Sequence, residues 1–143
     1  LRVAAVISRE EGLLLVKHSK AGREYYLLPG GGVMWGENMN EALSREIEEE
    51  TGLKVQAGKL LCVSETIFPD SSRHIVHMVF QGIERGGKLE PSRDPRVKGA
   101  EFIEFHHLES VELLPPIGEF LQRSYRSRFE EGAVYLGELW KEM

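Results

Sequence analysis

Residues 31–53 read GGVMWGENMNEALSREIEEETGL, and this stretch decides the fold. Asn38 followed three positions later by Glu41 has the pattern of a capping box, in which each side chain accepts a hydrogen bond from the other residue's backbone. Apolar residues then recur every four positions, at Met39, Leu43 and Ile47. Gly52 provides a C-terminal stop. The pattern predicts a helix from about Met39 to Thr51.

Acidic side chains crowd one face of this helix. Glu46, Glu49 and Glu50 stand at positions i, i+3 and i+4, so they fall within one arc of about a hundred degrees. Like charges at this spacing repel, and the helix dipole disfavours anions near its C-terminus. Arg45 can pair with Glu49, but one guanidinium cannot neutralise the whole group. A bound divalent cation is the economical explanation.

A run of acidic residues on a helix is by itself more often a solvated face than a metal site. The preceding residues favour the metal site. Glu37 stands just before the helix, and Gly30, Gly31 and Gly32 form a turn whose amides and carbonyls can approach phosphate or metal closely. Since Pro29 precedes these glycines, we expect neither helix nor paired strand there.

The stretch resembles the Nudix box of MutT-like hydrolases. The match reads Gly31, five residues, Glu37, seven residues, Arg45-Glu46-Ile47, one residue, Glu49-Glu50, one residue and Gly52-Leu53. Weaker likeness continues in 26–29 and 101–108. Met34 replaces an acid often found in the family, and Trp35 replaces a proline or small residue. Neither position defines the box. Hydrophobic packing is the expected role of both, with stacking on a base or packing against a partner subunit as the alternatives if they are exposed.

The resemblance implies an α/β fold, a Nudix-type α/β/α sandwich with a mixed β-sheet. It implies a metal-dependent pyrophosphohydrolase that cleaves a phosphoanhydride bond in a nucleoside diphosphate derivative, either a nucleoside triphosphate or an ADP-ribose-like sugar nucleotide. Mg²⁺ or Mn²⁺ would be held by Glu46, Glu49, Glu50 and the Gly30 carbonyl. Arg45 would orient the glutamates.

The general base and the substrate contacts stay open. Glu46 and Glu50 are candidates for the base, and some family members take it from a later loop, where this chain offers Glu84, Glu90, Asp94 and Glu101. The predicted substrate-binding residues are Arg23, Gly31, Gly32, Glu37 and Arg73. Other candidates for phosphate contact are Lys17, His18, Lys20, His74 and His77, for each of which a surface role, or for His77 a buried one, is the alternative.

Two further features bear on ligands. Pro69 falls sixteen residues after Leu53, like a proline in ADP-ribose-cleaving relatives, which favours ADP-ribose or a related sugar nucleotide, with triphosphates remaining open. His106 and His107 are adjacent and lack metal-ligand spacing.

The other elements are read from apolar runs and turn residues. Val3–Ile7 and Leu13–Val16 suggest a β-hairpin whose turn is 9–12. Further strands are expected at 25–28, 54–65, 75–84 and 100–105, loops at 68–72 and 89–98, and a helix at 117–129. Residues 133–140 fit a strand or a helix.

Size and charge bound the remaining possibilities. A chain of 143 residues fits one domain, 1–143. Its net charge of -5 argues against a general nucleic-acid binder but suits a small nucleotide held through divalent metal. No apolar run approaches the ~20 residues that span a bilayer. Cys62, the only cysteine, agrees with a reducing, cytoplasmic location. Residues 134–140 could support a homodimer.

Two other functions compete with hydrolysis. A nucleotide-binding sensor with weak catalysis would usually have lost a carboxylate of the box, and none is lost. The isopentenyl diphosphate isomerase reaction also uses the Nudix fold, but it needs a catalytic cysteine, and Cys62 is expected to be a buried thiol.

Overall fold

The computed structural model describes residues 1–10 and 12–142. The elements in chain order are β1 (Arg2–Val6), β2 (Ser8–Arg9), β3 (Gly12–Lys20), β4 (Arg23–Leu27), β5 (Gly30–Gly32), α1 (Met39–Thr51), β6 (Leu53–Ile67), β7 (His74–Gly87), β8 (Val97–Glu104), the 3-10 helix η1 (Phe105–Ser110), α2 (Gly118–Arg126) and β9 (Val134–Glu138).

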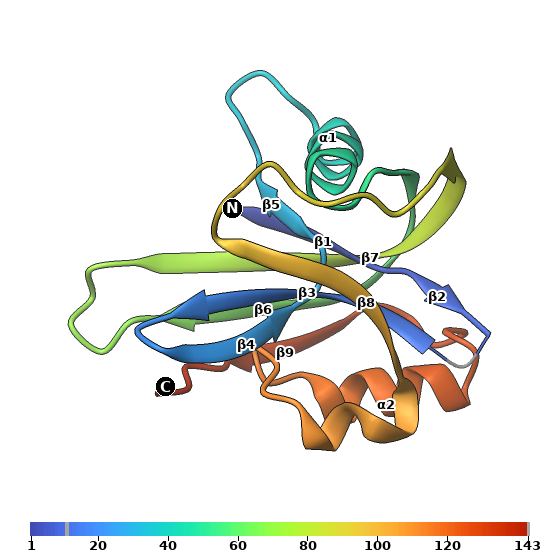
Figure 1. The fold of residues 1–143 in the computed structure, drawn as a ribbon. Coiled ribbons are helices and arrows are strands. Elements are labelled where there is room, and N and C mark those ends of the chain that lie inside the picture. Colours follow the sequence, from blue (N-terminus) through green and yellow to red (C-terminus); the bar gives the residue numbers. More distant parts are fainter. Residues whose placement is uncertain (11, 143) are drawn as a thin grey trace.

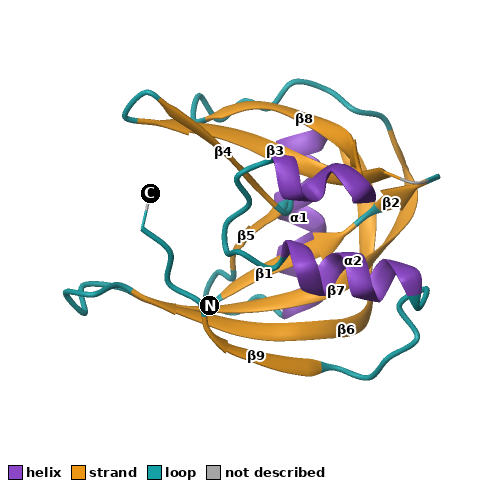
Figure 2. Cartoon of the chain, turned by 90° about the horizontal axis from the view of Figure 1, so that it is seen from below, coloured by secondary structure: helices purple, strands orange, loops and turns teal. Residues whose placement is uncertain are grey.

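The strands form two sheets between helices. One sheet has the order β5-β1-β7-β6-β9, and the other joins β2, β3 and β4, with β8 paired to the free side of β3. The first sheet is mixed, because β1 runs parallel to β7 while β6 runs antiparallel to it. Helix α1 lies on one side of the strands and α2 on the other (Figures 1 and 2). The expected α/β/α sandwich with a mixed sheet is confirmed.

Strand β1 shows how both faces are buried. Val3 and Ala5 pack with Leu43 and Ile47 of α1. Ala4 and Val6 point the other way, into the cluster that contains Leu121 of α2 and other residues. Because successive side chains of a strand face opposite sides, a strand covered on both faces reads as a continuous apolar run. Burial of β1 thus fixes the two helical layers around it.

The predicted hairpin between 3–7 and 13–16 is wrong. Strand β1 lies between β5 and β7, and β3 pairs instead with the short β2 through Ser8 and Arg9. A strand with two buried faces belongs in the middle of a sheet, which the apolar run of β1 indicates. The turn expected at 9–12 includes Glu11, which lies outside the described residues.

The glycine segment is also different from the expectation. Gly30–Gly32 form β5, which pairs antiparallel with β1 at Arg2, Val3 and Ala4. A Cβ at Gly30 would stand 2.0 Å from the Val3 carbonyl oxygen. Glycine therefore permits a close pairing that any side chain would block, and Pro29 only marks where the strand begins.

The remaining elements follow the sequence with adjusted ends. Strands β6 and β7 form a long hairpin whose connection is the expected loop at 68–72, and the loop expected at 89–98 ends where β8 begins at Val97. Helix α2 ends at Arg126, short of the expected Phe129, because Arg128 and Phe129 both adopt φ of 57°. Segment 134–138 is strand β9, parallel to β6. Within residues 1–10 and 12–142, no helix combines the length and apolar character needed to cross a bilayer.

Candidate active site

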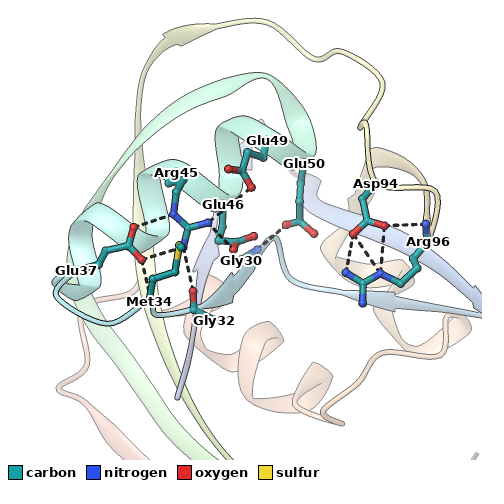
Figure 3. Close-up of polar contacts among 10 residues, drawn as sticks. All are labelled: Gly30, Gly32, Met34, Glu37, Arg45, Glu46, Glu49, Glu50, Asp94 and Arg96. Atoms are coloured by element: carbon teal, nitrogen blue, oxygen red, sulfur yellow. Dashed lines mark hydrogen bonds and ion pairs between the residues drawn. The ribbon is translucent and has the colours of Figure 1, made fainter.

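Helix α1 positions the acidic side chains. The capping box forms as predicted, with the Asn38 side chain accepting from the Glu41 amide at 2.8 Å and Glu41 accepting from the Asn38 amide at 3.2 Å. The helix spans Met39–Thr51, and Gly52 ends it in the left-handed conformation. Since the opposite face is buried against β1, the carboxylates of Glu46, Glu49 and Glu50 project from α1 toward the glycine strand (Figure 3).

Arg45 links the start of the helix to its acidic face. Its guanidinium donates to both carboxylate oxygens of Glu37, at 2.7 and 2.8 Å, to Glu46 at 2.8 Å and to the Gly32 carbonyl at 3.1 Å. The expected pairing with Glu49 is present but longer, at 3.7 Å. The hydrogen bonds from Arg45, with help from the Met34 amide, lower the pKa of Glu37 to about 2. Glu37 therefore anchors Arg45 as a permanent anion.

Glu50 has a different environment. It accepts a hydrogen bond from the Gly30 amide at 2.8 Å. Burial raises the pKa of Glu50 to about 7, and the nearby charges of Glu46 and Asp94 act in the same direction, while the Gly30 amide and Arg2 oppose the shift. A buried carboxylate with so little positive charge around it is stabilised by a bound cation, or else it takes up a proton near neutral pH. Glu50 thus has the properties of a metal ligand or a base.

The glycine strand is fitted to the acidic helix. A Cβ at Gly31 would lie 2.3 Å from the Glu46 side chain, whereas one at Gly32 would meet nothing within 4 Å. The glutamate carboxylate consequently sits directly against the backbone of β5. This close approach brings hard oxygen donors from a helix and from a glycine backbone together, which is the donor set that Mg²⁺ and Mn²⁺ prefer. The residues present therefore fit such an ion.

These groups line a cavity of about 1370 Å³ that contains both acidic and basic side chains, and we call these two sets its acidic and basic walls. The acidic wall contains Glu46, Glu48, Glu49, Glu50, Glu90 and Asp94. The basic lining consists of Arg2, Arg73, Arg93 and Arg96, with His18 and His74. An anionic substrate in this cavity would meet the arginines directly and the carboxylates through divalent metal.

The predicted substrate residues divide into three groups. Gly31, Gly32 and Arg73 line the cavity, as does Gly30 of the predicted metal site. Glu37 is held behind the acidic wall by Arg45. Arg23, on β4, is not among the lining residues. Its guanidinium instead lies 3.8 Å from the carboxylate of Glu112.

The four acids from later in the chain that are candidates for the general base lie in different places. Glu90 and Asp94 line the cavity, and Asp94 is gripped by Arg96 at 2.8 Å (Figure 3). Glu84 is bonded to Arg9, and Glu101 accepts from the Tyr26 hydroxyl at 2.7 Å. Only the first two of these four acids lie where they can reach a substrate in the cavity.

Sequence reasoning missed part of the basic wall. Arg2 donates to the Leu28 carbonyl at 3.0 Å and lines the cavity, as do Arg93 and Arg96. Nothing in an apolar strand marks its first residue as a ligand. The loop at 89–98 offered a weak signal, because Arg93, Asp94 and Arg96 gather charge in a segment with two prolines.

Other predicted roles are resolved by burial. Met34 and Trp35 do not pack as expected, because both are exposed, Trp35 completely, on the turn before α1. His77 is buried and its Nε2 lies 3.0 Å from the Thr66 hydroxyl. Lys17 lies over the Tyr26 ring, and Lys20 is exposed. Cys62 is buried as predicted, and burial raises its pKa to about 12, which leaves an unreactive thiol.

Comparison with known proteins gives consistent matches. The NUDIX domain model matches residues 1–127. An ADP-ribose pyrophosphatase of Methanocaldococcus jannaschii is 36% identical over 110 residues, covering 76% of this chain and 64% of that protein. An NAD-capped RNA hydrolase of Salmonella paratyphi C is 28% identical over 123 residues, covering 85% and 44% respectively. The chain thus spans less than two thirds of either relative's length.

The fold has close structural counterparts. A NUDIX hydrolase structure from Nitrosomonas europaea superposes with a TM-score of 0.76 at 21% identity, covering 89% of this chain and 88% of that one. At this identity the likeness concerns the arrangement of sheets and helices.

Proposed function

Because the chain belongs to the NUDIX domain family, we propose that it is a metal-dependent pyrophosphohydrolase that cleaves a phosphoanhydride bond in a nucleoside diphosphate derivative. One observation carries the proposal. The carboxylates of Glu46, Glu49 and Glu50 line, together with the glycine strand, a cavity large enough for such a substrate. Residues 1–143 would act as one domain, since both sheets contribute to both buried clusters.

The metal ligands in this proposal are Glu46, Glu49, Glu50 and the Gly30 carbonyl, for Mg²⁺ or Mn²⁺. When bound, the cation supplies neutralisation of the charge that develops on the phosphate oxygens during cleavage. Arg45 contributes by holding Glu46 and the Gly32 carbonyl in fixed positions. This chain's own residues thereby arrange the acidic wall before substrate arrives.

The base must accept a proton from the attacking water. Without a cation, burial raises the pKa of Glu50 to about 7, which suits an acceptor at neutral pH. A coordinated cation would lower that pKa, so Glu50 can take the proton only if it is not itself bound to the metal. Glu46 is the alternative on the helix. Asp94 is the alternative on the facing loop, where its ion pair with Arg96 lowers its pKa to about 2 and so weakens it as a base. Glu50 is therefore the first candidate for proton transfer.

The cavity favours a substrate with two large parts. Its volume of about 1370 Å³ exceeds the roughly 300–1,000 Å³ of ordinary small-molecule pockets. Its arginine lining would hold further anionic or sugar groups of the substrate. An ADP-ribose-like sugar nucleotide fits this arrangement better than a simple triphosphate. The ADP-ribose pyrophosphatase relative supports the same choice.

The other expectations remain predictions within this proposal. The absence of a nucleic-acid substrate is to be tested, since one relative is named for NAD-capped RNA. A cytoplasmic location agrees with the unreactive, buried Cys62. A homodimer is to be sought by ultracentrifugation, since Val134 and Tyr135 are exposed on the edge strand β9.

A substrate panel with Mg²⁺ tests the function. ADP-ribose, other sugar nucleotides and dinucleoside polyphosphates are assayed with alkaline phosphatase to release phosphate from newly exposed monoesters, triphosphates with inorganic pyrophosphatase, and NAD-capped RNA by chromatography. We expect the highest kcat/KM with a sugar nucleotide. Excess EDTA should abolish turnover, and added Mg²⁺ or Mn²⁺ should restore it, with products followed by chromatography in these two experiments because the coupling enzymes also need metal. Tight nucleotide binding without turnover of any substrate would instead identify a sensor.

A further inference from the structure

A second cluster of metal-ligating side chains lies where β8 passes into η1. The Glu104 carboxylate oxygen Oε2 is 2.9 Å from Nε2 of His106 and 3.7 Å from Nδ1 of His107. One ligand atom from each residue lies within 4.8 Å of the other two. This end of β8 adjoins the α2 side of the molecule, while α1 lies on the opposite side (Figure 1).

The spacing of His106 and His107 predicted no metal site, but the structure brings both rings close to Glu104. Adjacent residues of a regular strand point to opposite faces. Here the chain leaves the strand and enters a 3-10 helix at Phe105, so the rings of His106 and His107 turn toward each other, with centroids 4.0 Å apart. Glu104, the last residue of β8, reaches both rings. The change of backbone type therefore assembles the cluster.

We propose that Glu104, His106 and His107 bind a transition-metal ion such as Zn²⁺. Zinc bonds of about 2.0–2.2 Å to nitrogen and oxygen place tetrahedral ligand atoms roughly 3.3–3.6 Å apart. The two distances to the Glu104 oxygen bracket that separation, so small side-chain rotations suffice. Two imidazoles select zinc or a similar ion, whereas the all-oxygen set on α1 selects Mg²⁺ or Mn²⁺.

Glu109 is a nearby carboxylate that lies outside the cluster. With His106 it lines a hollow of about 440 Å³ between η1 and α2. Since the three primary ligands are exposed, water can complete the coordination.

Zinc binding to the whole chain tests the proposal. The protein is titrated with Zn²⁺ against a chromophoric chelator in excess Mg²⁺, which occupies the carboxylates of α1. We expect one equivalent of zinc in the wild type and its loss in the double variant His106→Asn/His107→Asn. Replacement of zinc by Co²⁺ should give absorption bands typical of nitrogen ligands in the wild type alone.

The control is a histidine–glutamate pair on the surface that lacks a second imidazole. His74 forms a single surface pair with Glu65 at 2.6 Å, and His74→Asn should keep the zinc equivalent. Circular dichroism without zinc verifies that each variant is folded. Equal zinc binding by the wild type and the double variant, or no zinc binding by either, would overturn the proposal. Hydrolysis of nucleotides is a separate readout and does not enter this test.

Discussion

The acidic and basic linings of the cavity are built in different ways. The part of the acidic wall that is proposed to bind metal comes from one stretch, residues 30–50, in which β5 leads through a short turn into α1. The arginines come from β1, from the β6–β7 connection and from the loop before β8. When functional residues come from one local segment, their spacing in the sequence determines how they are arranged. When they come from distant segments, their arrangement depends on the topology of the whole fold. The first should govern turnover and the second substrate choice.

The largest expected effect comes from the acidic wall. Glu50→Gln keeps the side-chain size but removes the charge that would hold metal or accept a proton. We expect kcat to fall by roughly a thousandfold with little change in the melting temperature. Steady-state kinetics with saturating Mg²⁺ measure the effect.

Glu119→Gln is the matched control for this loss of charge. Glu119 is exposed on α2, away from the cavity, so its variant should keep the wild-type kcat. If Glu50→Gln turned over at a near-normal rate, the assignment of the α1 carboxylates would be refuted.

The pairing of β5 with β1 is tested by glycine substitutions. A Cβ at Gly30 would collide with the backbone of Val3 at 2.0 Å, whereas one at Gly32 would meet nothing within 4 Å. Gly30→Ala should therefore lower the free energy of unfolding by about 3 kcal/mol, and Gly32→Ala by less than about 0.5 kcal/mol. Urea denaturation compares the two, and equal losses would show that β5 is not held as described.

The stability of the fold should depend on pH through His77, which pairs in the sheet with Arg2 of the basic wall. Burial, with the charge of Arg2 on the adjacent strand, lowers the pKa of His77 from 6.5 to about 4. Between these values His77 binds more protons in the unfolded than in the folded chain, so its contribution to stability is complete above about pH 6.5 and falls as the pH approaches 4, whereas the raised pKa of Glu50 acts in the opposite direction. We expect a loss of roughly 2–3 kcal/mol from this group.

Denaturation midpoints measured from pH 7 to pH 4 detect that loss. His77→Asn should flatten this part of the pH dependence, although it lowers stability at neutral pH. An unchanged slope in the variant would mean that other groups cause the acid sensitivity.

The smallest effect is expected for a single arginine of the basic wall. Arg73→Gln should raise KM for the preferred substrate about tenfold and leave kcat unchanged, because the contact acts equally in the bound and transition states. Arg123→Gln, exposed on α2, is the control. A fall in kcat with constant KM would instead show that Arg73 acts in the chemical step. It would contradict the proposal that the acidic wall governs turnover and the basic wall substrate choice.

The same division explains what the sequence could predict. Helix α1, its capping box and its glycine stop were predictable to the residue, because each depends on neighbours within four positions. Arg45 is correctly predicted to contact the acidic face of the helix. Its strongest contact is nevertheless Glu37, eight residues away, which helical spacing alone does not reveal.

The pairing of strands was less accessible. An apolar run such as 3–7 predicts a strand but not its neighbours, so β1 was assigned to β3 instead of β5 and β7. Arg2 enters the cavity only because β1 lies inside the sheet, next to the edge strand β5 that the glycines form. Exposure of Trp35 was likewise missed, since hydrophobicity alone does not show that a turn projects from the fold.

The membership of Gly30–Gly32 in the central sheet has a consequence for recognition. A free loop would lose conformational entropy each time it gripped a phosphate group, whereas a hydrogen-bonded strand has already lost that freedom when the protein folds. In the proposed function the glycine backbone would therefore act as a preorganised template, and adaptation to different leaving groups would come from the segment between Gly87 and Val97, which no ladder constrains in this way.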